Sequence, residues 1–514
     1  MRRQSRRLKN SHEMQTPVES FNRHVCLSVS GGYELLPKPL RSTSWRCRPD
    51  DQLGSGFRTI LAEKLLHHGF RVSFLLITTQ ATAAQTQFFQ SPAAVLPDLT
   101  IINLPPADVS NILTDEMRIL TQLSIITRES LKPLKSILVA LNPEAIIIDI
   151  FTSDAIEVCR EISIPVYSFF TASTVLLTFS LYLPTLDREV DGEFVELPAP
   201  IEIPGCRAMR TEDILDQIVN VMHLTDRKND EYKWYLLHVS RLRYAVGIFL
   251  NAWEDLDPDR IKALRENPFF KNIPIPPVYP IGPLIEKGES LTEQDAKILT
   301  WLDNQPSESV LFVCLGSAGT LSSKQLGELA LGIEMSGQRF IMVVRPPTDA
   351  RADSMFFTVG RDENDPSAYM PDGFLERTRG VGLVVATWAP QLVLLRHPST
   401  GAFLSHCGWN STLESLVEGV PMIAWPLYAE QRMNAAMLVE EAGVAVNVKP
   451  EERGVVVGRE VVKRVVTAVM EGEEGKRIRR RARELKESAR IALENGGPSE
   501  ISLLRFLNIW KCVN

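Results

Sequence analysis

The chain has 514 residues, of which 44% are hydrophobic and 23% charged, and its formal net charge is −7. This composition is typical of a globular protein, and the length predicts two large domains because single hydrophobic cores stop growing at about 250–300 residues. The negative net charge argues against a general binder of nucleic acid or other polyanions.

The cysteines and the apolar segments argue against a disulfide-rich, zinc-binding or membrane-spanning protein. The seven cysteines are scattered and form no CxxC pair, which favours reduced thiols in a cytoplasmic protein over a disulfide framework or a zinc site. Residues 163–186 carry no charge, but their eight serines and threonines and their prolines favour a buried strand and helix over a membrane span. The basic residues 1–10 lack the apolar stretch of a secretory signal, although a transit peptide stays open.

Short apolar runs alternate with helical patterns along the whole chain. They are HVCLSV, RVSFLLIT, LTIINLP, AIIIDIF, IPVYSFF and AVGIFLNAW in the first half, and SVLFVCLG, RFIMVVR, GLVVAT, TGAFLSH, PMIAWP and VAVNV in the second. Nearly continuous hydrophobic strands are typical of parallel sheets that helices cover on both faces. The sequence therefore predicts two doubly wound α/β domains.

The segments between these runs predict the domain limits. We expect an N-terminal domain at 1–275, a proline-rich and then polar linker at 276–306, a C-terminal domain at 307–498 and a final helix at 499–514 that packs back on the body. Ser322 and Gln325 predict the start of a helix that ends at Gly337. Residues 346–373 predict a surface loop, and the acids around the basic segment 476–490 favour a solvated helix over a nucleic-acid site.

The stretch SHCGWNSTLES, residues 405–415, places polar side chains where a buried strand turns into a helix. Ligands of open parallel sheets bind at such turns, and a helix start suits a phosphate. Ser411 and Glu414 have the spacing of a capping box, which predicts Ser411 as the N-cap, and Gly408 lets a ligand approach the backbone. On these residues alone, a simple helix cap and a buried core role for His406 stay open, whereas too few ligands lie nearby for a metal site.

From Trp388 the chain reads WAPQLVLLRHPSTGAFLSHCGWNSTLESLVEGVPMIAWPLYAEQ, which ends at Gln431. This stretch resembles the nucleotide-sugar signature of plant family 1 UDP-glycosyltransferases, in particular the glucosyltransferases for hydroquinone and phenylpropanoid alcohols. VLFVCLGSAGTLS, residues 310–322, resembles the phosphate-side loop of the same family. The resemblance implies the GT-B fold, in which two Rossmann-like domains face each other across a cleft, and it implies no metal or other cofactor.

The resemblance also implies roles for individual residues. Trp388 would stack on uracil, the backbone of Ala389 and Gln391 would hydrogen-bond its edge, and Glu414 would accept from the ribose hydroxyls. The residues that would surround the diphosphate are Ser317, His406, Gly408, Asn410 and Ser411. The sugar hydroxyls would be bound by Trp409, Glu430 and Gln431, with Tyr428 lining the same wall. In this family, a glutamine at the position of Gln431 indicates glucose as the donor sugar.

For the reaction, the resemblance implies inverting transfer of glucose from UDP-glucose to a hydroxyl of a small apolar acceptor. A histidine would take the proton and an aspartate would orient it. Asp149 in IIIDIFTSD matches the aspartate, and Asp154 is expected to serve the following helix start. We expect a monomer that binds neither nucleic acid nor a membrane.

The catalytic histidine has no counterpart in this chain. Residues 28–59 depart from the family pattern, and the best local match sets Glu34 in the place of the histidine. A carboxylate with an ordinary pKa of about 4.3 is a weak base at neutral pH. Two expectations follow: a nucleotide-sugar-binding protein with impaired transfer, or an ordinary enzyme whose residues 28–59 reflect a frame error or a retained non-coding segment.

Overall fold

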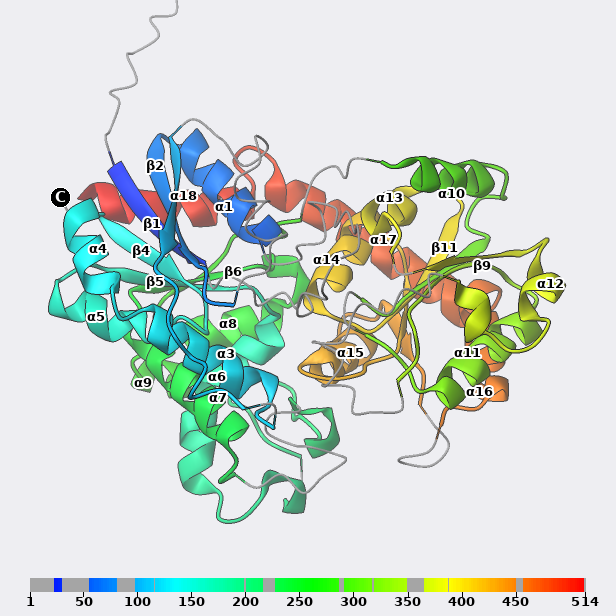
Figure 1. Ribbon diagram of the computed structural model, residues 1–514, viewed down its shortest axis with the longest axis horizontal. Helices are drawn as coiled ribbons and strands as arrows, with labels where there is room; N and C mark the ends of the chain where they lie inside the picture. Colours follow the sequence, from blue (N-terminus) through cyan, green and yellow to red (C-terminus); the bar gives the residue numbers. More distant parts are fainter. Residues whose placement is uncertain are drawn as a thin grey trace, which may run out of the picture.

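The computed structural model consists of two α/β halves that lie side by side (Figure 1). Each half is built on one parallel sheet with helices on both faces, which confirms the prediction of two doubly wound halves. The residues that the structure describes are 23–29, 55–80, 98–114, 116–197, 200–215, 227–285, 291–316, 319–348, 365–386, 388–449 and 456–512.

The N-terminal half contains a seven-stranded sheet in the order β3-β2-β1-β4-β5-β6-β7. Its strands are β1 (Arg23–Val29), β2 (Phe70–Ile77), β3 (Leu99–Leu104), β4 (Ala145–Ile148), β5 (Val166–Phe170), β6 (Gly247–Leu250) and β7 (Val278–Pro280). Its helices are α1 (Ser55–His67), α3 (Ile119–Ser130), α4 (Leu134–Leu141), α5 (Ala155–Glu161), α6 (Thr174–Glu189), α7 (Asp230–Arg241), α8 (Pro258–Glu266) and α9 (Pro268–Asn272). Every residue of β4, β5 and β6 is buried, as continuous apolar runs predict.

The C-terminal half contains a six-stranded sheet in the order β10-β9-β8-β11-β12-β13. Its strands are β8 (Val310–Cys314), β9 (Arg339–Val344), β10 (Gly382–Ala386), β11 (Thr400–Ser405), β12 (Met422–Ala424) and β13 (Ala445–Asn447). Its helices are α10 (Glu293–Asp303), α11 (Ser323–Ser336), α12 (Phe374–Thr378), α13 (Gln391–Arg396), α14 (Trp409–Glu418), α15 (Gln431–Glu440), α16 (Arg459–Met470) and α17 (Glu473–Leu493), and the last helix of the chain is α18 (Pro498–Cys512).

The predicted helix after β8 begins and ends as the sequence indicates. The Ser322 hydroxyl accepts from the Gln325 amide at 3.2 Å, and Gly337 ends α11 with a φ of 68°. This left-handed backbone is the one that glycine adopts without a steric penalty.

The described part of the segment expected as a linker, 276–306, contains a strand and a helix. β7 adds a seventh strand to the N-terminal sheet, and α10 begins at a Thr292–Asp295 capping box. The three-residue β7 is too short to be distinguished from proline-rich loop by its apolar pattern. The division of the chain into domains by residue number therefore stays a prediction, with β7 on the N-terminal side.

The chain returns to its first half at the end. In Figure 1 the red α18 lies over the N-terminal half, where it packs against β7. The Phe506 ring packs edge-on against Tyr167 and Phe249, with ring centroids 4.7 and 4.6 Å apart, and so joins the core of the N-terminal sheet.

Helix α15 of the C-terminal half is tied to the N-terminal half at its C-terminal end. Arg260 of α8, which is 3% exposed, places its guanidinium against the Glu441 carboxylate with two hydrogen bonds of 2.7 and 2.8 Å. Arg207 and Arg210 reach Glu440 at 2.9 and 2.6 Å. These cations also face the negative end of the helix dipole, so charge and dipole act in the same direction.

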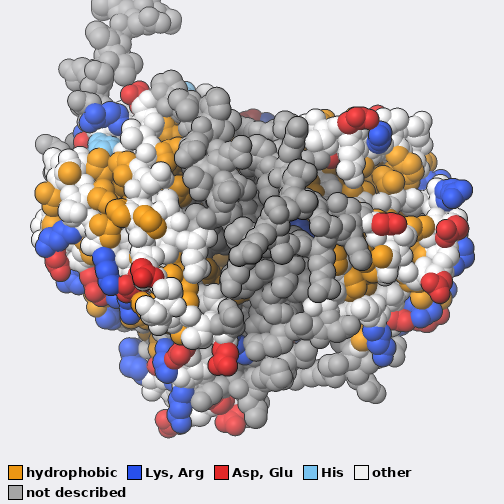
Figure 2. Space-filling view, viewed as in Figure 1, with side chains coloured by type: hydrophobic (Ala, Val, Ile, Leu, Met, Phe, Trp, Pro, Cys, Tyr) orange, Lys and Arg blue, Asp and Glu red, His pale blue; other side chains and the backbone are white. Residues whose placement is uncertain are grey.

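The described surface carries charges of both signs. In Figure 2, Lys and Arg side chains alternate with Asp and Glu along the edge of each half, with hydrophobic side chains scattered between them. On α17 the expected solvated helix is confirmed, because Lys476, Arg477 and Arg490 each pair with a glutamate three residues away. No helix among the described residues is long and apolar enough to cross a membrane; residues 163–186 form β5 and most of α6 instead.

Candidate functional site

The polar stretch after β11 forms a sharp turn into α14. Cys407 has a φ of 63°, and Gly408 takes the N-cap position with an extended backbone. α14 therefore begins at Trp409, and the Thr412 amide donates to the Gly408 carbonyl at 2.9 Å. The prediction that Ser411 is the N-cap is wrong, because the turn at Cys407 and Gly408 starts the helix earlier than the capping-box spacing indicates. The N-cap residue is a glycine and supplies no capping side chain to this described helix start, whose first N–H groups have no partner within the helix itself.

His406 lies at the same turn, between two glycines. A Cβ atom added to Gly316 or Gly408 would lie 2.6 or 2.4 Å from the imidazole ring, so both positions need glycine for the ring to fit. His406 is 9% exposed, and its Nδ1 atom has no hydrogen-bond partner in the described structure. Burial, and then the nearby charge of Arg345, lower the pKa of His406 to about 4. The imidazole is therefore neutral at pH 7 and acts as a hydrogen-bonding group without charge.

Two of the residues expected to contact the nucleoside are connected by hydrogen bonds. The Gln391 amide, at the start of α13, donates to the Glu414 carboxylate at 2.5 Å and to the Ser411 hydroxyl at 2.9 Å. Trp388 and Ala389 precede Gln391 in the loop after β10; Trp388 is half-buried and Ala389 is buried. The structure thus brings the expected uracil and ribose residues to one edge of the sheet, next to the start of α14.

The residues expected at the sugar lie around the start of α15. Gln431 is 3% exposed, and its side-chain carbonyl accepts from the Leu427 and Tyr428 amides at 2.9 and 3.1 Å, which holds the turn before the helix. Burial raises the pKa of Tyr428 to about 12 and also raises the pKa of Glu430. Tyr428 is therefore a neutral phenol that can donate a hydrogen bond.

The indole N–H of Trp409 makes a hydrogen bond within the protein. Its Nε1–H donates to the Asn251 carbonyl of the N-terminal half at 2.8 Å, and the side chain is buried. The prediction that Trp409 binds sugar hydroxyls is therefore limited to its backbone. A second bond across the halves runs from the Ser173 hydroxyl to the Asn434 side chain at 2.7 Å, while Asn434 donates to the Cys407 carbonyl.

Asp149 follows β4 at the edge of the N-terminal sheet. It is 4% exposed, and its Oδ1 accepts from the Thr152 amide and hydroxyl at 2.8 and 2.9 Å. The next residue in this turn, Ser153, lies 2.8 Å from Nδ1 of the fully buried His238, whose Nε2 lies 2.8 Å from Ser124. This arrangement fixes the position of the Asp149 carboxylate.

Asp154 stands at the N-cap position of α5, as expected, but its side chain makes no capping bond. The carboxylate instead lies 3.0 Å from Arg241 and 3.3 Å from Arg128. The two arginines come from α7 and α3, more than twenty residues away in sequence, so the local pattern around Asp154 gives no sign of them.

Three positions need separate mention. Glu34 and Ser317 lie outside the described residues, and Asn410 occupies the second position of α14. Among the described residues, no three His, Cys, Asp or Glu side chains come together as a metal site would need. Sequence reasoning missed Arg345, Thr320, Asn251 and Asn434; only Arg345 left a sequence signal, as a charge directly after the apolar run of β9.

Comparison with known proteins shows which family the chain resembles. Residues 296–473 match the family described as UDP-glucoronosyl and UDP-glucosyl transferase. The chain is 44% identical to anthocyanidin 3-O-glucosyltransferase 5 of Manihot esculenta over 86% of this chain and 90% of that protein. It is 43% identical to the hydroquinone glucosyltransferase of Rauvolfia serpentina over 87% and 93%.

Solved structures show the same fold. TcCGT1 in complex with UDP is 39% identical, with a TM-score of 0.82 over 96% of this chain and all of that one. Phytolacca americana UGT2, complexed with UDP-2fluoro-glucose and pterostilbene, is 37% identical, with a TM-score of 0.80 over 95% of this chain and 100% of that one.

Proposed function

Because the chain belongs to the plant UDP-glycosyltransferases, which are transferases of the GT-B fold, we propose that it transfers glucose from UDP-glucose to a hydroxyl of a small apolar acceptor. The observation that carries the proposal is the start of α14 at Gly408 beside His406, with the Gln391–Glu414 pair next to it. Such a helix start binds an anion, and the adjacent carboxylate is the group that a ribose needs.

The donor binds along the edge of the C-terminal sheet. Trp388 stacks on uracil, and the backbone of Ala389 and Gln391 reads its edge. In the free protein the Gln391 amide donates to Glu414; in the complex the ribose hydroxyls donate to the same carboxylate. The diphosphate lies against the first N–H groups of α14, at Asn410 and Ser411, with Ser317 in the loop after β8.

Sugar recognition falls to the start of α15. Glu430 and Gln431 contact the glucose hydroxyls, and Tyr428 forms the wall beside them. The support for this assignment is the turn at 427–431, which Gln431 holds from within, so that the position of its amide is set by the backbone. The Gln431 carbonyl already accepts from two backbone amides, so the NH₂ group is the part of this amide that donates to a sugar hydroxyl.

In the transfer step, the acceptor oxygen forms a bond to the anomeric carbon from the face opposite UDP. The bond between that carbon and the phosphate oxygen breaks, its electron pair leaves with UDP, and the product is a β-glucoside. A base takes the acceptor proton, and the rigidly held Asp149 orients that base and stabilises its charge. In the sequence, the best local match sets Glu34 at the place of this base; a carboxylate becomes neutral when it takes the proton, so the charge stabilisation by Asp149 applies to a histidine only.

A second candidate function is a nucleotide-sugar-binding protein that transfers glucose poorly. The observation that favours it is the absence of a histidine from residues 28–59 of the sequence, where the family carries its base. Both functions need the same donor site, so binding of UDP-glucose does not separate them, whereas turnover does.

The test uses the full chain. Calorimetry with UDP measures the donor site, and incubation of UDP-glucose with phenols, flavonols and monolignols, followed by mass spectrometry, measures transfer. UDP binding together with a glucoside supports the transferase, and UDP binding without any glucoside supports the binding protein. A chain that binds no UDP refutes both.

Two further properties belong to the proposal. The acceptor class is supported by the relatives, which glucosylate hydroquinone and anthocyanidin by name. We also propose a monomer in the cytoplasm, consistent with the free cysteines among the described residues; gel filtration and a fluorescent fusion test these two points.

A further inference from the structure

Arg345 directly follows β9 at the edge of the sheet that holds the proposed donor site. β9 pairs with β8 from Val310↔Arg339 to Val313↔Met342, and β8 pairs with β11 up to Ser405↔Cys314. Continuing both registers beyond the strand ends sets Arg345 level with Gly316 and with the turn at Cys407. Neighbouring strands lie about 4.8 Å apart, so Arg345 stands within two strand spacings of the start of α14.

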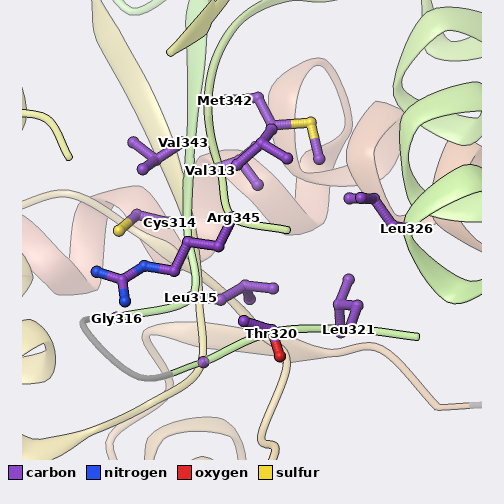
Figure 3. Close-up of a pocket in the computed structure, with 12 residues that line it drawn as sticks. Val313, Cys314, Leu315, Gly316, Thr320, Leu321, Leu326, Met342, Val343 and Arg345 are labelled. Atoms are coloured by element: carbon purple, nitrogen blue, oxygen red, sulfur yellow. The ribbon is translucent and has the colours of Figure 1, made fainter. Parts of the chain in front are cut away.

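The side chain of Arg345 turns toward this turn. In Figure 3 it runs from the end of β9 across the strand edge, and its guanidinium lies on the side of Cys314 and Gly316. After burial, its positive charge lowers the pKa of His406, and it acts in the same direction on Tyr428. The guanidinium is therefore close enough to act on residues expected at both the phosphate and the sugar.

The surroundings of Arg345 hold polar groups that lack partners. Arg345 lines a small pocket of about 20 Å³ together with Gly316 and Thr320. The Thr320 hydroxyl and His406 Nδ1 are buried, and neither has a hydrogen-bond partner in the described part of the chain. Buried polar atoms without partners are costly, and a ligand with several acceptor oxygens removes that cost.

We propose that Arg345 binds the diphosphate of the nucleotide sugar and stabilises it as the leaving group. The inference rests on the proposed function. The diphosphate of UDP-glucose carries two negative charges, and it gains a third when the bond to the anomeric carbon breaks and the electron pair stays on the phosphate oxygen. The start of α14 supplies about half a positive charge, and the neutral His406 supplies a hydrogen bond only. Arg345 adds a full positive charge in a planar fork that fits two phosphate oxygens.

The test measures the contribution of the phosphates to binding separately from that of the nucleoside. UDP, UMP and uridine are titrated calorimetrically into the full chain, the variant Arg345→Gln and the control Arg339→Gln. Arg339 lies at the other end of β9, about 20 Å away, and its substitution removes the same charge. Because a hydrogen-bonded charge is lost, Arg345→Gln should weaken UDP binding by about 10- to 100-fold and leave uridine within about twofold. Arg339→Gln should change neither.

The outcomes are distinct. Unchanged UDP binding by Arg345→Gln overturns the inference alone, and so does an equal loss for UDP and uridine, which marks a structural role. A wild-type chain that binds neither UDP nor uridine overturns the proposed function as well. If Arg345→Gln does not fold, Arg345→Lys decides: it keeps the charge without the fork, and it should lose part of the preference for UDP over uridine, whereas a full preference contradicts the proposal.

Discussion

Replacing Glu414 by alanine should weaken UDP binding by about 1–3 kcal/mol, because two ribose hydroxyls lose a charged acceptor. The free protein should lose little. The Gln391 amide gives up its bond to Glu414 but keeps the one to Ser411 at 2.9 Å, so the free energy of unfolding should fall by less than about 1 kcal/mol. The binding loss corresponds to a dissociation constant about 5- to 150-fold higher.

Calorimetry with UDP and 2′-deoxy-UDP measures this effect. The wild-type chain should prefer UDP, and Glu414→Ala should bind the two ligands equally, since the group that distinguishes them is gone. Glu473→Ala serves as the control: it removes the same charge at the exposed start of α17. Unchanged UDP affinity in Glu414→Ala, or a preference for UDP that survives the substitution, would refute the ribose assignment.

The remaining predictions concern donor choice, the base and acid stability. UDP-glucose should exceed UDP-galactose by at least about tenfold in kcat/KM because of Gln431; equal turnover in a competition assay contradicts this. The chain as given should form glucoside at most about a hundredth as fast as a variant with a histidine-bearing loop in place of residues 28–59, since a positioned base contributes roughly 10²–10⁴-fold; comparable rates by mass spectrometry would show that another group takes the proton. Burial lowers the pKa of His238 from 6.5 to about 4, so the unfolded chain takes up that proton first as the pH falls. The stability from a neutral His238 is therefore complete above pH 6.5 and is lost, by up to about 3 kcal/mol, as the pH falls toward 4. Urea unfolding between pH 7 and 4.5 should show a shallower loss for His238→Asn, and parallel curves for both proteins would disprove the assignment.

The sequence predicted those features that depend on neighbours along the chain. The parallel sheets follow from apolar runs such as those of β4 and β11, and the limits of α11 follow from Ser322 and Gly337. The prediction of Ser411 as the N-cap was wrong for a local reason. The left-handed backbone at Cys407 starts the helix earlier, and the capping-box spacing of Ser411 and Glu414 does not reveal it.

What the sequence did not reveal depends on contacts between distant residues. His238 meets Ser153 only because α7 packs beside the turn after β4, and Asn434 meets Ser173 across 261 positions. Arg345 belongs to the same class, because its relation to α14 arises from the order β9-β8-β11 in the sheet. The residue types along the chain do not reveal the order of the strands in a sheet.

The ion pairs at the C-terminal end of α15 affect which halves of related proteins can be combined with a half of this chain. Gln431 begins the helix at the proposed sugar site, while Glu440 and Glu441 end it against arginines from the first half. A chimera that joins this second half to the first half of a relative is expected to keep the geometry of the proposed sugar site only if the incoming half supplies matching cations. The compatible unit for exchange thus includes Arg207, Arg210 and Arg260, and a splice point chosen by sheet boundaries alone would separate them from their partners.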